Sequence, residues 1–175
     1  MSELYDQIVG QRGTLENIVA SIPGFKGYQD KQARRTADRM LREHLAQLIQ
    51  QRHDRFIRIE KLILDNGGMK YMPRTRNAKS VLQRYRDNIE LAMPKYDGMW
   101  AQMKIGAEEL EKIYAFDEAQ MRYLDTIDGV LDEMQNSASG EGLDSAIMNF
   151  ETTLHEAIDA FALRDDVLTN LNQDK

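Results

Sequence analysis

Few residues of this sequence have the types and spacing that chemistry requires. The most distinctive is Arg52, an arginine within an apolar helical stripe. At 100° per residue, Arg52 lies one turn from Leu48 and one turn from Phe56. Asp117 and Asp128 fall in the same way on the apolar line of a later segment. Because a guanidinium buried without a partner is very costly, we expect Arg52 to pair with these aspartates and to fix the register of two helices. The alternative is a polar core site for a small anion or a cofactor.

Metal-binding and catalytic patterns are missing. Helical bundles hold di-iron centres with Glu-x-x-His pairs, and none of the residues three positions before His44, His53 and His155 is a glutamate. The chain has no cysteine, and it contains neither a glycine-rich phosphate loop nor a nucleophile elbow. We therefore expect no enzyme, no metal and no cofactor.

Two surface features could bind a partner, and the first is basic. Residues 26–86 hold 16 basic and 6 acidic side chains, whereas residues 101–175 hold 5 basic and 17 acidic ones. We expect Arg35, Arg39 and Arg42 on one side of a helix, away from the core, where they could neutralise phosphates. Two observations argue against this interpretation. Acidic residues close to these arginines in the same helix can pair with them and lower the net positive charge. The basic and acidic halves of the chain can also pack side by side and neutralise each other.

The second feature is a pair of loops with aromatic residues. The turns at residues 23–28 and 94–100 are two helices apart, so an up-and-down bundle would bring them to the same end. There the sequence predicts an aromatic cap formed by Phe25, Tyr28, Tyr96 and Trp100. Such a cap is either a docking surface for a protein or peptide, since aromatic residues are enriched in interfaces, or a plug that keeps water off the bundle end.

Apolar stripes with helical spacing indicate the elements that would position these residues. Glycine and proline turns separate the stripes, and no segment alternates with the period of a strand. The expected helices span residues 2–22, 30–65, 75–93, 107–135 and 143–170. The sequence therefore predicts an all-α protein, an elongated antiparallel bundle of four to five helices with coiled-coil-like packing. One helix is long, with about 35 residues, and a single domain covers residues 1–175.

Composition narrows the function further. No stretch reaches the roughly 18 uncharged apolar residues that a membrane-spanning helix needs, the N-terminus lacks a secretory signal, and the lack of cysteine favours the cytoplasm. We expect a non-enzymatic helical scaffold or protein-interaction module that binds a protein partner or associates with itself. The alternative is binding of nucleic acid or another anionic surface through residues 26–86, and such binding must weaken steeply as salt rises.

Overall fold

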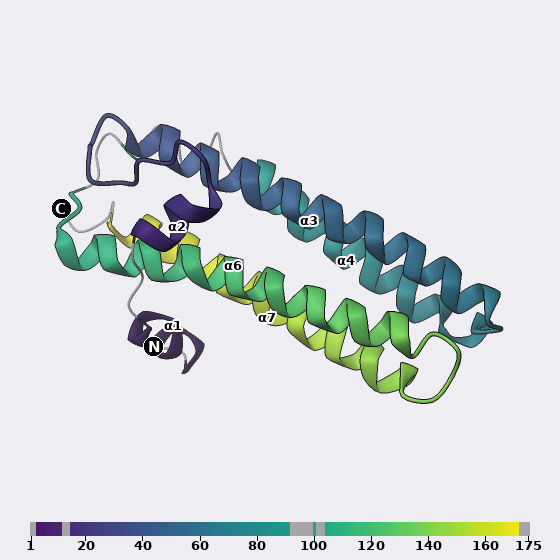
Figure 1. Cartoon of the computed structure of the whole chain (residues 1–175). Helices are drawn as coiled ribbons and strands as arrows, with labels where there is room; N and C mark the ends of the chain where they lie inside the picture. Colours follow the sequence, from purple (N-terminus) through teal and green to yellow (C-terminus); the bar gives the residue numbers. More distant parts are fainter. Residues whose placement is uncertain (1–2, 12–14, 92–99, 101–103, 172–175) are drawn as a thin grey trace.

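The computed structural model of the protein describes residues 3–11, 15–91, 100 and 104–171 (Figure 1). Its helical elements are α1 (Glu3–Gly10), α2 (Leu15–Ser21), α3 (Arg34–Asp65), the short 3₁₀ helix η1 (Met69–Tyr71), α4 (Met72–Leu91), α6 (Ala107–Asn136) and α7 (Leu143–Leu171). The described part of the chain contains no strand. The all-α class is confirmed, and the long helix is α3, with 32 residues.

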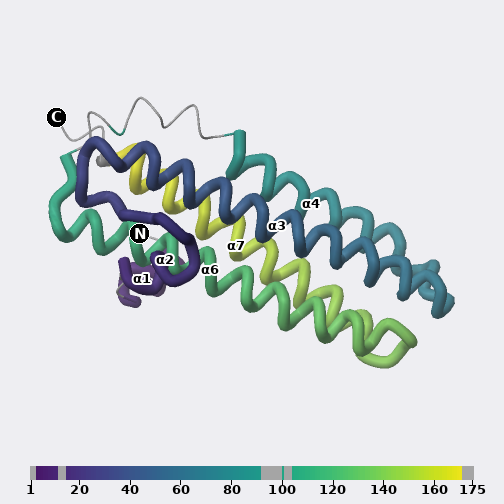
Figure 2. Tube along the Cα trace, turned by 45° about the horizontal axis from the view of Figure 1, so that its top comes forward, coloured from purple at the N-terminus to yellow at the C-terminus, as the bar shows by residue number. Residues whose placement is uncertain are grey.

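The four long helices form an elongated bundle of two antiparallel hairpins. One hairpin is α3 with α4 and the other is α6 with α7, and the hairpins pack as two layers through α3 on α6 and α4 on α7 (Figures 1 and 2). The helices that pack across the layers, α3 with α6 and α4 with α7, run parallel to each other. The expected antiparallel packing is therefore present only within each hairpin. Successive long helices α4 and α6 do not pack side by side, because they lie on a diagonal of the bundle.

The segment expected as one helix over residues 2–22 is divided into α1 and α2, which lie outside the bundle against α6 (Figure 2). Gly10 ends α1, and a second glycine, Gly13, follows before α2. Each glycine would cost about 1 kcal/mol in a helix interior, and together they favour a break over a continuous helix.

The turn from α3 to α4 is one of the glycine turns that the sequence predicts. Gly67 has φ of +83°, its N–H donates to the Leu64 carbonyl (3.0 Å), and the Gly68 N–H donates to the Ile63 carbonyl (2.9 Å). These two bonds satisfy the last carbonyls of the helix, which is the geometry of a Schellman motif. The turn therefore reverses the chain tightly and sets α4 beside α3.

The main core runs between the two layers. The ring centroids of Phe56 in α3 and Phe150 in α7 are 5.0 Å apart, which places aromatic packing across the diagonal of the bundle. Other fully buried side chains of this core are Leu45, Ile49, Leu82, Ile127, Leu131 and Ile147. Among the described helices, none combines the length and apolar composition required to cross a membrane.

Candidate functional site

The arginine singled out in the sequence lies between α3 and α6. Arg52 is 8% exposed, and its Nη2 is 2.5 Å from Asp128 Oδ2. The same guanidinium donates from Nε to the Leu124 carbonyl (3.2 Å) and from Nη1 to the Leu48 carbonyl (2.9 Å). Each of its three nitrogens therefore binds the protein itself, and Arg52 acts as a cross-link between the two layers.

Asp117 is not a partner of Arg52. It precedes Asp128 by eleven residues in α6, about 16 Å along the helix axis, so one guanidinium cannot reach both carboxylates. Asp117 is instead fully buried and accepts hydrogen bonds from Arg164 Nε (2.6 Å) and from the Tyr28 hydroxyl (2.7 Å). The predicted pairing of Asp117 with Arg52 is therefore wrong.

Asp117 belongs to a group of bonded polar side chains at the end of the bundle where α3 begins. This buried charge cluster consists of Tyr28, Asp38, Arg42, Asp117, Arg164 and Asp165. Arg164 Nη2 donates to Asp38 Oδ1 and to the Tyr28 hydroxyl, both at 3.0 Å. Arg42 bridges Asp38 (2.9 Å) and Asp165 (2.8 Å). The cluster thereby joins α3, α6, α7 and the loop before α3 at one place.

The sequence contains a signal for Arg164, the central residue of this cluster. Arg164 stands three residues after Phe161 and four before Leu168, and both of these are buried in α7. The helical projection that singles out Arg52 therefore applies equally to Arg164. Asp38 stands one turn before Arg42, the spacing of an intrahelical ion pair, and the structure contains this pair. No local pattern links it to α7.

Burial determines the electrostatics of the cluster. It raises the pKa of the Asp117 carboxyl, because the cost of desolvating the carboxylate outweighs the attraction of the Arg164 guanidinium. Burial by itself would lower the pKa of Arg164, but the neighbouring carboxylates, Asp117 first, raise it well above its usual range. Arg164 therefore remains charged and serves as a structural cross-link within the cluster.

Three of the four residues of the predicted aromatic cap are buried. Phe25, Tyr28 and Trp100 are at most 3% exposed, and the Tyr28 and Trp100 rings stack with centroids 5.3 Å apart. The Tyr28 N–H donates to the Tyr114 hydroxyl (3.0 Å), which fixes the loop on α6. Tyr96 lies outside the described residues. Burial of Phe25, Tyr28 and Trp100 favours the interpretation as a plug over that as a docking surface.

The predicted basic face is divided. Arg35 and Arg39 are exposed on α3, but Arg42 is fully buried. The Arg42 guanidinium lies over the Phe161 ring, 5.2 Å from its centroid, while binding its two carboxylates. The three arginines therefore do not share one surface, because the partners of Arg42 lie inside the bundle.

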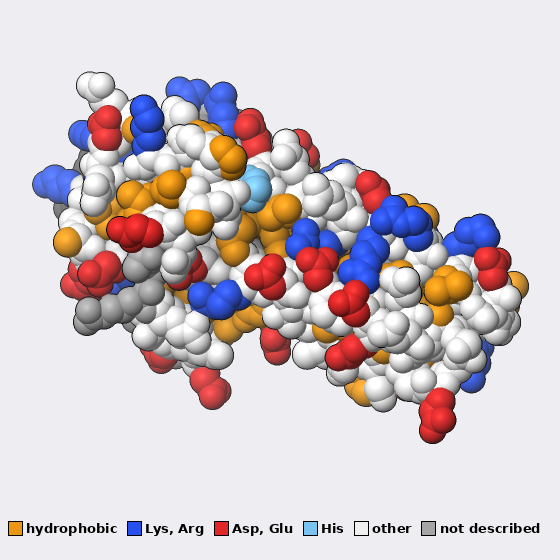
Figure 3. Space-filling view, in the orientation of Figure 1, with side chains coloured by type: hydrophobic (Ala, Val, Ile, Leu, Met, Phe, Trp, Pro, Cys, Tyr) orange, Lys and Arg blue, Asp and Glu red, His pale blue; other side chains and the backbone are white. Residues whose placement is uncertain are grey.

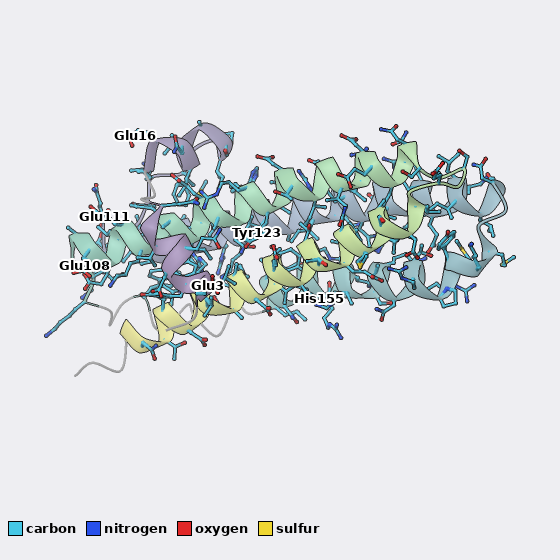
Figure 4. All side chains as sticks on the ribbon, turned by 90° about the horizontal axis from the view of Figure 1, so that it is seen from below. Glu3, Glu16, Glu108, Glu111, Tyr123 and His155 are labelled. Carbon is cyan, nitrogen blue, oxygen red and sulfur yellow. The ribbon has the colours of Figure 1, made fainter. Side chains whose placement is uncertain are left out.

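A cavity of about 270 Å³ lies between α1, α6 and α7. Ile8 and Ala119 line its apolar part, and its polar lining consists of Gln7, Gln11, Arg122, Tyr123, Thr126 and Glu156. Figure 4 shows Tyr123 on α6, whereas His155 lies on α7 outside the lining. Burial and the nearby Glu156 raise the pKa of Tyr123. Within the described ranges, no three histidine, aspartate or glutamate side chains come together as a metal site.

The buried tyrosines predict how the fold responds to alkali. Burial raises the pKa of Tyr28 and of Tyr85 above the ordinary value of 10.0. Between pH 10 and their folded pKa values, the folded state therefore binds more protons than the unfolded state. The contribution of these protonated tyrosines to the free energy of unfolding is therefore fully present below about pH 10, and it is lost as the pH rises through their folded pKa values. We expect the final part of the tyrosinate absorbance, from the buried tyrosines, to rise together with the loss of the helical circular dichroism in alkali, and ionisation of every tyrosine in an intact helical fold would contradict this.

Comparison with known proteins identifies no relative. No family model, no curated protein and no solved structure matches the chain.

Proposed function

We propose that this protein is a cytoplasmic, non-enzymatic helical scaffold that acts by binding proteins, a second copy of itself included. The observation that carries the proposal is the position of the charges. The basic and acidic halves of the chain form opposite layers of one bundle, and they bind each other.

The basic layer uses many of its cations inside the bundle. Arg42, Arg52, Arg55 and Arg74 all bind carboxylates of the α6–α7 layer. The exposed bases of α3 and α4 are Arg35, Arg39, Arg58, Lys61, Arg76 and Arg84, and the exposed acids among them are Glu43, Asp54, Asp65 and Glu90. This mixed surface is a weak match for a polyphosphate, since nucleic-acid binding depends on a concentrated basic patch.

The outer surface of the α6–α7 layer is acidic. Its exposed acids are Glu108, Glu111, Asp125, Asp132, Glu133, Asp144, Glu156, Asp159 and Asp166, and Arg122 is the exposed base of the described part of these helices. In Figure 3, acidic side chains lie along α6 opposite basic side chains of α3. A negative surface repels nucleic acids and anionic lipids, so it favours protein contacts.

Light scattering coupled to size exclusion tests the proposal. We expect a mass above the 20.2 kDa of one chain. Two copies with a net charge of −6 repel each other, so their association should strengthen when salt rises from about 0.05 to 0.5 M and screens this repulsion. A mobility-shift assay with duplex DNA and with single-stranded RNA should show no retardation at low salt.

The salt dependence separates this proposal from its alternative. Nucleic-acid binding through residues 26–86 would give a shift that disappears as salt rises, the opposite trend. Such a shift, or a monomer at every protein and salt concentration, would overturn the proposal.

A further inference from the structure

Helix α1 is attached to the bundle by a small apolar cluster of its own. Ile8 is 3% exposed, and the ring of Tyr5 lies 5.8 Å from that of Phe116. The other apolar side chains that α1 contributes are Leu4 and Val9. This cluster is separate from the main core, so the docking of α1 depends on a few local contacts.

The surface under α1 is shaped to receive a helix. This α1-binding surface is made by α6 and α7 and consists of Ala115, Phe116, Ala119, Ala160, Leu163 and Val167. Its three alanines are at most 1% exposed, and small side chains let a helix approach closely. Because α6 and α7 pack on each other and on the other layer, this surface would persist if α1 left it.

Helix α1 is poorly suited to remain folded by itself. It has eight residues, fewer than the roughly 12–15 at which an isolated helix becomes marginally stable in water. It ends at Gly10, and four residues, 11–14, separate it from α2. Its helical structure therefore depends on the α1-binding surface, and a surface of the same composition exists on every other copy of the chain.

We propose that the α1-binding surface also receives α1 of a second copy, so that two chains exchange their N-terminal helices. This inference rests on the proposed self-association, and the exchanged α1 is the contact through which two copies would associate. The structure itself shows that the occupant fits, since α1 already fills this surface. Reciprocal exchange closes into a two-fold dimer, and a connection as short as the four residues 11–14 is typical of chains that exchange an element.

Cross-linking between two single-cysteine chains tests the exchange. The natural chain has no cysteine, so an engineered thiol is the only one present. Gln7 of α1 and Thr126 of α6 line the same cavity, so Gln7→Cys in one chain and Thr126→Cys in another come close only if α1 of the first docks on the second. After both full-length chains are mixed and equilibrated, a short bis-maleimide should join them with a yield about tenfold above random collision.

Two matched controls define the background. Ser139→Cys lies in the α6–α7 turn at the opposite end of the bundle, so mixing it with Gln7→Cys reports random collision (Figure 1). Adding Ile8→Asp to the Gln7→Cys chain removes the apolar anchor of α1 and should lower the yield to that background, while the helical signal of the bundle persists.

The outcomes distinguish the exchange from the proposed function. A yield no higher than the Ser139→Cys background, from protein that light scattering shows to be oligomeric, overturns the exchange and leaves self-association intact. Background yield from protein that is monomeric at every concentration overturns both.

Discussion

Replacing Arg164 by alanine is expected to lower the free energy of unfolding by about 3–5 kcal/mol, a large part of the stability of a domain of this size. The substitution leaves Asp117 and Asp38 buried without the guanidinium that both of them bind. Asp117 keeps the Tyr28 hydroxyl and Asp38 keeps Arg42, but neither neighbour replaces the lost charge. Removing one member of a buried charge network costs more than the network contributes as a whole, because the remaining charges stay in an apolar interior.

Urea unfolding followed by circular dichroism measures this loss. Arg122→Ala is the matched control, because Arg122 is exposed and forms a long surface ion pair, 3.9 Å, with Glu118 one turn away. The control should change the free energy of unfolding by no more than about 0.5 kcal/mol.

The pH dependence identifies the mechanism of the loss. The pKa of Asp117 is already raised by burial and should rise further without Arg164, so protonation in mild acid should restore part of the stability of the variant relative to the natural protein. A variant that unfolds like Arg122→Ala, or a loss that does not change with pH, would show that the cluster is not a buried charge network.

Much of the fold can be predicted from the sequence because its causes are local. The apolar stripe of α3 and the cap at Gly67 each depend on residues within a few turns, and both are present. The break between α1 and α2 and the diagonal placement of α4 and α6 were missed. Both depend on competition between tertiary contacts, which hydrophobic periodicity does not encode.

The polar interior shows the same limit. A helical projection gives the face on which a side chain lies, so it identifies Arg52, Asp117 and Asp128 as inward-facing. It does not give the axial register between helices, and therefore it does not show that Asp128 lies at the level of Arg52 and Asp117 at the level of Arg164. The buried position of Arg42 was missed for a related reason, because its partner Asp165 is 123 residues away in the chain.

The second large effect is expected at the link between the layers. Arg52→Ala should lower the free energy of unfolding by about 2–3 kcal/mol, because it removes the close partner of Asp128, leaving Arg55 3.9 Å away, and the bond from Arg52 to the Leu124 carbonyl across the two layers. The loss should be smaller than at Arg164, since the Asp128 side chain is 42% exposed and can bind water. Arg52→Met should cost less than Arg52→Ala, because the methionine keeps the packing of the aliphatic stem.

A double-mutant cycle decides whether the pair itself is responsible. The losses of Arg52→Ala and Asp128→Ala should fail to add by about 1–2 kcal/mol, which is typical of directly bonded residues. The stem of Arg52 contributes to each Arg52 variant but cancels in the cycle, so only the interaction with Asp128 gives this coupling. If Arg52→Ala unfolds like the natural protein, or if the two losses simply add, the link does not fix α3 on α6. The parallel register of the two layers would then depend on the apolar core and the buried charge cluster.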